Sequence, residues 1–171
     1  MRPLLALLCL ACAAPQYPDV SVRCASGGEG RGVVVSPMHV LVSRHQVTAC
    51  AGSMTADGHP IVVQEISDAG DGALLATYWE QWDRWAIPGP APVVGERVCS
   101  RRLGCGAVLA HTSDGFLWDH QTHPGDSGSG IYDSRGRLVG VVSGSGTVVV
   151  GREVWGLWLR NLPRVCLECE W

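Results

Sequence analysis

The sequence predicts an all-β fold made of many short strands joined by turns. The chain has 171 residues, of which 22 are glycine and 10 are proline, and both residue types punctuate strands. Valines gather in short runs, and few long stretches have the spacing of an amphipathic helix. One domain of this length buries about two thirds of the surface that its unfolded chain exposes, which is enough for one substantial core.

The first stretch of the chain is typical of an export signal. A positive start at residues 1–3 precedes an apolar run, and Ala11-Cys12-Ala13 fits the small-x-small pattern of a cleavage site, so we expect removal of residues 1–13. A lipid anchor on Cys12 is the alternative, although Cys9 stands where that signal normally has leucine. The apolar run is shorter than the roughly 20 residues that span a bilayer. We therefore expect a secreted or periplasmic protein without a membrane span.

The first half of the mature chain, about 18–86, contains a series of expected strands. They lie at 17–24, 32–35, 38–42, 61–65 and 73–75, where apolar residues alternate with polar ones or form short runs. The glycine-rich stretch 27–32 lacks the lysine and the helix of a phosphate-binding loop, so it predicts a β-turn. His45 directly follows one expected strand, and Asp71 stands just before another.

Three tryptophans form the most unusual segment. Trp79, Trp82 and Trp85 recur every third residue, so a short helical turn would place them on one side. They would form either a docking ledge for a partner, a glycan or a membrane interface, or a cover over the gap between the two halves of the chain. We favour the cover, because aromatic residues at helical spacing usually pack.

A proline-rich linker at about 87–92 separates the second half, about 93–160, from the first. Further strands are expected at 93–98, 106–110, 116–118, 131–132, 138–142 and 148–150. A short terminal helix is expected at 157–162, and a C-terminal tail is expected at 161–171.

Ser127 lies in the sequence His-Pro-Gly-Asp-Ser-Gly-Ser-Gly at 123–130. Small neighbours suit a nucleophile on a tight, exposed turn, because they let a substrate carbonyl approach the backbone. The backbone N–H groups of Gly125 and Ser127 would then form an oxyanion hole. Without partners such a run is more often a simple β-turn, since glycine, aspartate and serine are the commonest turn residues.

The partners are present in the order His45, Asp71 and Ser127. A histidine in such a set takes the proton of the serine, and an aspartate fixes the tautomer of the imidazole. His59 and Asp68 are the nearest rivals. His59 stands in an Asp-Gly-His-Pro turn, and only Asp71 directly precedes an apolar strand, so we assign the catalytic roles to His45, Asp71 and Ser127.

These motifs resemble those of the trypsin-like (chymotrypsin-fold) serine proteases, and the compact bacterial and viral branch in particular. The similarity runs from about residue 20 to about residue 146 and includes Gly-Arg-Leu-Val-Gly-Val-Val-Ser-Gly-Ser-Gly at 136–146. The resemblance implies a chymotrypsin-like double β-barrel in a single peptidase domain at 14–171. It also implies a serine endopeptidase that acts through an acyl-enzyme and uses no cofactor or metal.

The resemblance further implies a set of substrate-binding residues. Gln121 would lie at the base of the primary specificity pocket, and Ser143 would support the aspartate of the triad. The full expected set is Gln121, Thr122, His123, Ser143, Gly144 and Ser145. Because Gln121 is neutral, we expect a neutral residue in the pocket rather than arginine or lysine. The chain has no Ile-Val-Gly-Gly-like activation site, so Asp126 needs a partner other than a freed N-terminus.

Six cysteines remain after the signal, and an even number in an exported chain favours disulfides. Cys24 and Cys50 match the bridge that the family often places beside its histidine. The other four, Cys99 with Cys105 and Cys166 with Cys169, form either two further bridges or a four-cysteine zinc site.

The charge pattern excludes a nucleic-acid partner. The formal net charge is −3, all thirteen basic residues are arginine, and no basic run is interleaved with aromatics. We expect a monomer whose partners are protein or peptide substrates. Two alternatives remain open, namely a catalytically inactive binding module on the same scaffold and a lipid-anchored envelope protein.

Overall fold

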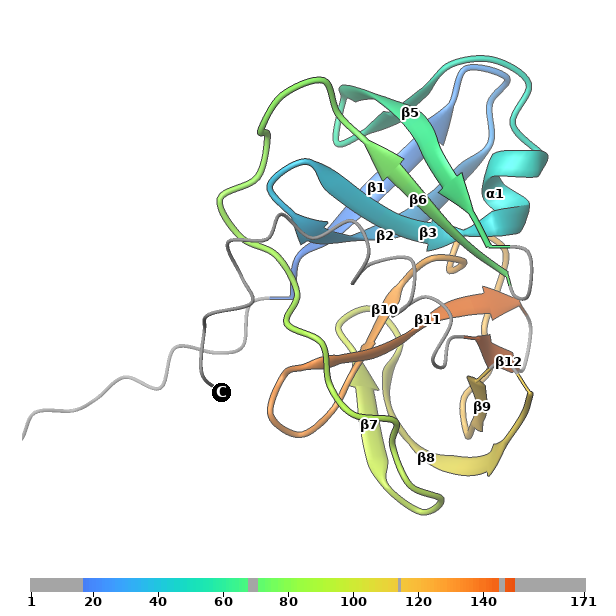
Figure 1. Ribbon diagram of the computed structural model, residues 1–171. Coiled ribbons are helices and arrows are strands. Elements are labelled where there is room, and N and C mark those ends of the chain that lie inside the picture. Colours follow the sequence, from blue (N-terminus) through green and yellow to red (C-terminus); the bar gives the residue numbers. More distant parts are fainter. Residues whose placement is uncertain (1–16, 68–70, 114, 145–146, 150–171) are drawn as a thin grey trace, which may run out of the picture.

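The computed structural model describes residues 17–67, 71–113, 115–144 and 147–149. These residues form two closed antiparallel β-barrels, which Figure 1 shows one above the other. The predicted signal at 1–13, the C-terminal helix at 157–162, the tail, Ser145, Cys166 and Cys169 lie outside the described residues. No helix in the described part of the chain is long and apolar enough to cross a membrane.

The first barrel follows the expected strands closely. Around it the strands run in the order β1-β2-β3-β6-β5-β4. They are β1 (Asp19–Cys24), β2 (Glu29–Ser36), β3 (His39–Ser43), β4 (Met54–Ala56), β5 (His59–Ile66) and β6 (Gly72–Ala76). A single turn of helix, α1 (Arg44–Thr48), follows β3. The tight turn between β1 and β2 lies at 24–28, so the β-turn predicted at 27–32 is right only at its first two glycines, and residues 29–32 already belong to β2.

The second barrel closes in the order β10-β11-β12-β9-β8-β7. Its strands are β7 (Arg97–Ser100), β8 (Gly104–His111), β9 (Gly115–Trp118), β10 (Gly130–Tyr132), β11 (Leu138–Gly144) and β12 (Thr147–Val149). The expected strand at 93–98 is wrong in its first half. Gly95 has φ 86° and the N–H of Glu96 bonds back to the carbonyl of Val93, so a turn precedes β7 and leaves Val93 exposed.

Three apolar clusters hold the molecule together. One fills the first barrel around Val22, Val42 and Leu75, and another fills the second around Phe116 and Ile131. A third lies where the barrels meet and combines residues of both: Val33, Val35, Leu41, Leu74, Ala86, Tyr132, Leu138 and Val141. Because the residues of this third cluster are buried, the two barrels pack against each other through a continuous apolar interface.

The tryptophan segment is not helical, so the expected helical turn is wrong. The N–H groups of Gln81 and Trp82 both donate to the carbonyl of Pro37, between β2 and β3, rather than to their own helix. Trp82 packs on the first-barrel cluster, whereas Trp79 is 63% exposed and Trp85 is 39% exposed. The expected cover over the gap between the two halves is therefore wrong as well, because Trp82 packs on the first barrel and none of the three tryptophans belongs to the cluster where the barrels meet.

Two of the expected disulfides are present. Cys24 and Cys50 join the end of β1 to the residues after α1, and Cys99 and Cys105 join opposite positions of β7 and β8. The second bridge leaves neither Cys99 nor Cys105 as a thiolate, which is the form that zinc binds. The four-cysteine zinc site is therefore wrong.

Candidate active site

The first barrel brings a histidine and an aspartate together because β3 and β6 are neighbours. Ser43 and Gly72 are the last paired residues of these two antiparallel strands. Arg44, which follows Ser43, therefore lies beside Asp71, which precedes Gly72. The N–H of Arg44 donates to the carbonyl of Asp71 over 2.9 Å, and the N–H of His45 donates to Asp71 Oδ1 over 2.9 Å. The backbone at the start of α1 thus holds the Asp71 carboxylate in place independently of its contact with the imidazole.

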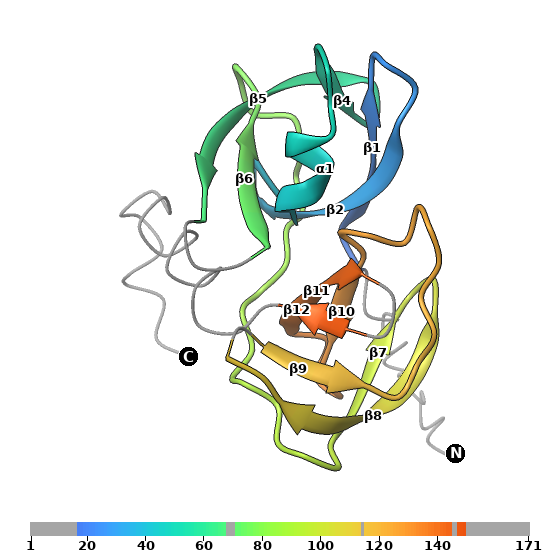
Figure 2. The same cartoon turned by 90° about the vertical axis from the view of Figure 1, so that its right-hand side faces the viewer.

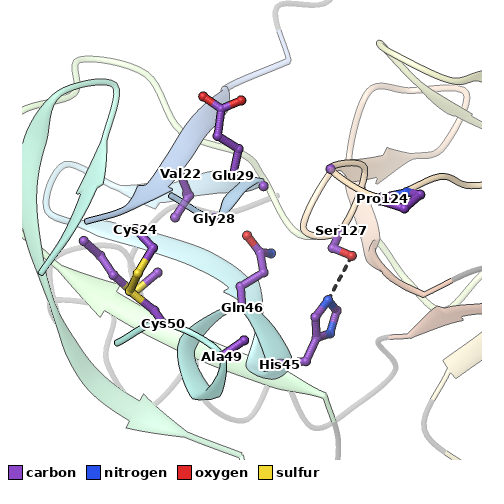
Figure 3. Close-up of a pocket in the computed structure, with 13 residues that line it drawn as sticks. Val22, Cys24, Gly28, Glu29, His45, Gln46, Ala49, Cys50, Pro124 and Ser127 are labelled. Atoms are coloured by element: carbon purple, nitrogen blue, oxygen red, sulfur yellow. Dashed lines mark hydrogen bonds between the residues drawn. A yellow bond between two sulfur atoms is a disulfide. The ribbon is translucent and has the colours of Figure 1, made fainter. Parts of the chain in front are cut away.

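A continuous chain of hydrogen bonds links three side chains from both barrels. His45 Nδ1 lies 2.7 Å from Asp71 Oδ2. His45 Nε2 lies 2.9 Å from Ser127 Oγ, and Figure 3 marks this second contact with a dashed line. Ser143 of β11 donates a further hydrogen bond to Asp71 Oδ2. With an ionised aspartate the Nδ1 atom carries the proton, so Nε2 is the acceptor that faces the serine hydroxyl.

The loop that carries Ser127 is fastened to both barrels. The N–H of Arg31 on β2 donates to the carbonyl of Ser127 over 2.8 Å, and the N–H of Gly128 donates to Val142 on β11 over 2.7 Å. Figure 2 shows this loop, which precedes β10, reaching from the second barrel to β2. Gly128 has φ 85°, and a Cβ there would overlap the carbonyl oxygen of Arg31, so only glycine fits. The small residue after Ser127 is thus required by the docking of the barrels.

The turn before Ser127 leaves two backbone donors available. The N–H of Asp126 donates to the carbonyl of His123, and Gly125 has φ 92°, as expected at the third position of a type II turn. In the described part of the chain no acceptor is bonded to the N–H of Gly125 or of Ser127. Both groups can therefore donate to an oxygen that approaches the serine.

Asp126 is buried and holds that turn in place. Its side chain is 4% exposed, Oδ1 accepts a hydrogen bond from Nε of Arg102 over 2.8 Å, and Oδ2 accepts one from the N–H of His123 over 2.7 Å. Arg102 lies in the turn between β7 and β8. This arginine is the partner that Asp126 needed in the absence of a freed N-terminus, and no local sequence pattern marks it.

A partly buried carboxyl group lies at the start of β1. Asp19 accepts a hydrogen bond from the hydroxyl of Tyr132 over 2.6 Å, and burial raises its pKa to about 6, although Tyr132, the backbone of Gly130 and two nearby arginines act in the opposite direction. Burial, together with the charge of Asp19, holds the pKa of Tyr132 well above its usual range. The tyrosine hydroxyl therefore remains protonated and joins the start of β1 to β10.

The residues expected to bind substrate are only partly brought together. Thr122 is buried, His123 is exposed, and Ser143 faces the aspartate rather than open solvent. Gln121 is also exposed, so it does not form a closed floor. Gly144 ends β11, and Ser145 is outside the described residues.

The cleft beside Ser127 contains a pocket of about 260 Å³ that sequence reasoning missed (Figure 3). Its lining includes His45, Gln46 and Met54 of the first barrel and Pro124 and Gly125 of the serine loop. Arg44, beside the histidine, does not block it, because its Nη1 donates to the carbonyl of Ser67.

Two closed barrels, with a histidine and an aspartate on the first and a serine on the second, define a chymotrypsin-like double β-barrel. This is the fold of the trypsin-like serine proteases, and it confirms the fold class expected from the sequence.

Solved structures of two other proteins have the same architecture. The active form of the Rv3671c protease from M. tuberculosis is 21% identical to this chain, with a TM-score of 0.62 over 84% of this chain and 80% of that one. An inactive form of the same protein, with a serine-to-alanine substitution, matches 88% of this chain and 91% of that one at the same TM-score. Deg5 is 15% identical, with a TM-score of 0.67 over 90% of this chain and 91% of that one. At these identities the likeness establishes the fold. No protein-family model and no curated protein matches the chain.

Proposed function

We propose that this protein is a serine endopeptidase that hydrolyses peptide bonds through an acyl-enzyme. The observation that carries the proposal is the hydrogen-bonded chain of Asp71, His45 and Ser127, with contacts of 2.7 and 2.9 Å at the junction of the barrels. A serine is a weak nucleophile by itself and is activated by an adjacent base that a third group orients. All three parts of that arrangement are in hydrogen-bond contact here.

The reaction follows from the positions of the protons. His45 Nε2 removes the proton of Ser127 as Oγ attacks the substrate carbonyl carbon, and the N–H groups of Gly125 and Ser127 donate to the resulting oxyanion. The imidazolium then gives its proton to the departing amine, the C–N bond breaks, and the acyl group remains on Ser127. Water repeats the sequence with His45 as base, and Asp71 stabilises each imidazolium that forms.

The proposed preference on the acyl side is for neutral residues. Gln121 and Thr122 carry no charge, so the pocket that the resemblance assigns to them offers no partner for an arginine or lysine side chain. The two disulfides support a secreted or periplasmic location, since such bonds persist in oxidising compartments. Protein or peptide substrates are the partners in this proposal, and the enzyme acts as a monomer.

Labelling with a fluorophosphonate probe tests the proposal directly. The purified, oxidised protein should become labelled on Ser127, and both Ser127→Ala and His45→Ala should reduce the labelling rate by roughly 10⁴-fold or more. Circular dichroism and thermal melting of each variant show whether the fold is retained. A folded wild-type protein that takes no label would overturn the proposal and favour a binding module on the same scaffold.

A further inference from the structure

The pocket beside the serine lies almost entirely on the first barrel. Its walls come from β1, β2, α1 with its C-terminal end, and β4, while the second barrel adds only Pro124, Gly125 and Ser127 (Figure 3). None of the described residues that the resemblance assigns to the primary specificity pocket lines it. It is therefore a depression separate from the one expected at Gln121.

The interior of this pocket is apolar. Val22 and Met54 are 2% and 6% exposed and belong to the core of the first barrel, the Cys24–Cys50 disulfide forms another wall, and Ala49 borders it at the end of α1. A volume of about 260 Å³ is several times the ~30 Å³ that a water molecule occupies in the liquid, so the pocket has room for a side chain.

Most polar groups of the lining are already engaged. Nε2 of Gln46 donates to the carbonyl of Arg31 over 3.1 Å and to Oγ of Ser43 over 2.7 Å. Its Oε1 is buried and has no hydrogen-bond partner among the described residues, so it is the one unsatisfied acceptor of this side chain. Glu29 forms an ion pair with Arg23 over 2.6 Å, and its side chain is 61% exposed. The pocket therefore offers an incoming residue apolar contact more than charge or hydrogen bonds.

The chemistry of His45 indicates which half of a substrate lies over this pocket. In the proposed reaction the imidazolium must donate its proton to the departing amine, so the amine leaves from a position next to Nε2. His45 itself lines the pocket, and so does Gln46, which follows it in α1. A side chain carried by the departing amine can therefore reach the pocket without crossing the cleft.

We propose that this pocket receives the side chain of the residue directly after the scissile bond and selects aliphatic and aromatic residues there. The inference rests on the proposed peptidase function, and it adds a specificity that the acyl-side residues do not determine. Ala49, Met54 and Val22 are the residues that set the preference.

Aminolysis of a common acyl-enzyme isolates this side of the cleft. Acylation of Ser127 with p-nitrophenyl acetate forms the same acetyl-enzyme in every experiment, and an added amine then competes with water for the acetyl group. The amine attacks the ester carbon, loses a proton to His45 and leaves as its N-acetyl derivative, while Ser127 regains its proton. Mass spectrometry of the products gives the ratio of aminolysis to hydrolysis, with Ser127→Ala as the background.

Leucinamide and phenylalaninamide should capture the acetyl group at least roughly tenfold better than glycinamide or aspartamide, since an apolar pocket discriminates side chains to that extent. Ala49→Phe should fill the pocket and abolish the advantage. Ala49→Asp should remove it and favour argininamide instead. The matched control is Ala51→Phe, because Ala51 is exposed and is not part of the lining.

The outcomes distinguish a failure of the pocket assignment from a failure of the peptidase function. Equal capture of all four amines, or an equal loss in Ala49→Phe and Ala51→Phe, would overturn the pocket assignment while acylation and fluorophosphonate labelling leave the peptidase function standing. Absence of acylation and labelling in the folded wild type would overturn the peptidase function, and the pocket assignment would fall with it.

Discussion

The guanidinium of Arg102 donates a hydrogen bond from Nε to the buried Oδ1 of Asp126 over 2.8 Å. Asp126 directly precedes Ser127, and its Oδ2 holds the N–H of His123, so the arginine stabilises the whole turn that presents the free N–H of Gly125. A charge on a turn of the second barrel therefore maintains the conformation on which the proposed oxyanion hole depends.

Replacement of Arg102 should impair both stability and reactivity. In Arg102→Gln the buried carboxylate of Asp126 loses a charged donor, which should cost about 1–3 kcal/mol in the free energy of unfolding. Urea denaturation measures that loss, and the fluorophosphonate labelling rate should fall by roughly tenfold or more as the turn loosens. Arg97→Gln is the control, since the side chain of Arg97 is exposed and does not contact Asp126. Equal effects of the two substitutions would contradict the role given to Arg102.

Gly128 should be far less tolerant of a side chain than another glycine with the same backbone conformation. Gly58 has φ 86° and open space around it, whereas Gly128 has φ 85° and a Cβ there meets Arg31. Gly58→Ala should cost about 1–2 kcal/mol, the usual penalty of a left-handed conformation. Gly128→Ala should cost roughly 3 kcal/mol or more, because overlap with backbone is added to that penalty. Thermal melts of both variants measure the difference, and similar melting temperatures would rule out the steric constraint.

The disulfides should differ in their contribution to stability according to the loops that they close. Cys24 and Cys50 are separated by 26 residues, and Cys99 and Cys105 by 6. Loop-closure entropy gives about 3.5 kcal/mol for the longer loop and about 2 kcal/mol for the shorter one. Urea denaturation of the two double serine variants tests this order. A larger loss for the Cys99–Cys105 variant would mean that the native contacts, rather than chain entropy, dominate.

Stability should decline as Asp19 ionises. Burial raises its pKa from 3.8 to about 6, so between these values the folded protein binds the proton more tightly than the unfolded chain does. The free energy of unfolding therefore falls with rising pH across that window, by at most about 3 kcal/mol. Asp19→Asn keeps an acceptor for Tyr132 and removes the titration, so it should be stabilising at pH 7 relative to wild type and close to neutral at pH 4.

The comparison of wild type with Asp19→Asn cancels the other titrating groups. Urea denaturation of both proteins at several pH values from 4 to 7 gives the difference directly. A difference that stays constant over this range would show that Asp19 does not change its proton affinity on folding.

Local rules in the sequence were enough to find the three side chains that the structure joins. His45 follows a strand, Asp71 precedes one, and Ser127 has small neighbours, so each could be recognised within a few residues. The all-β class followed from the spacing of short strands, and the double barrel followed from the resemblance that these motifs carry.

Features that depend on long-range packing were not predictable in this way. Arg102 stands beside another arginine, and only the β7–β8 turn decides which of them reaches Asp126. The pocket beside His45 combines residues from several separate segments, none of which has a motif of its own. The spacing of Trp79 and Trp82 suggested a helix, but their segment bonds to the β2–β3 hairpin, and that tertiary contact overrides the local pattern.

The hydrogen bond between Arg31 and Ser127 joins two halves that are incomplete when apart. His45 and Asp71 belong to the first barrel, whereas the serine belongs to the second. Domains emerge N-terminal part first during synthesis. Under the proposed function, a growing chain would therefore hold a base without a nucleophile, and later a nucleophile that has not yet reached its base. The proposed hydrolytic activity would begin only when the barrels dock, so late assembly would limit digestion of each molecule by itself.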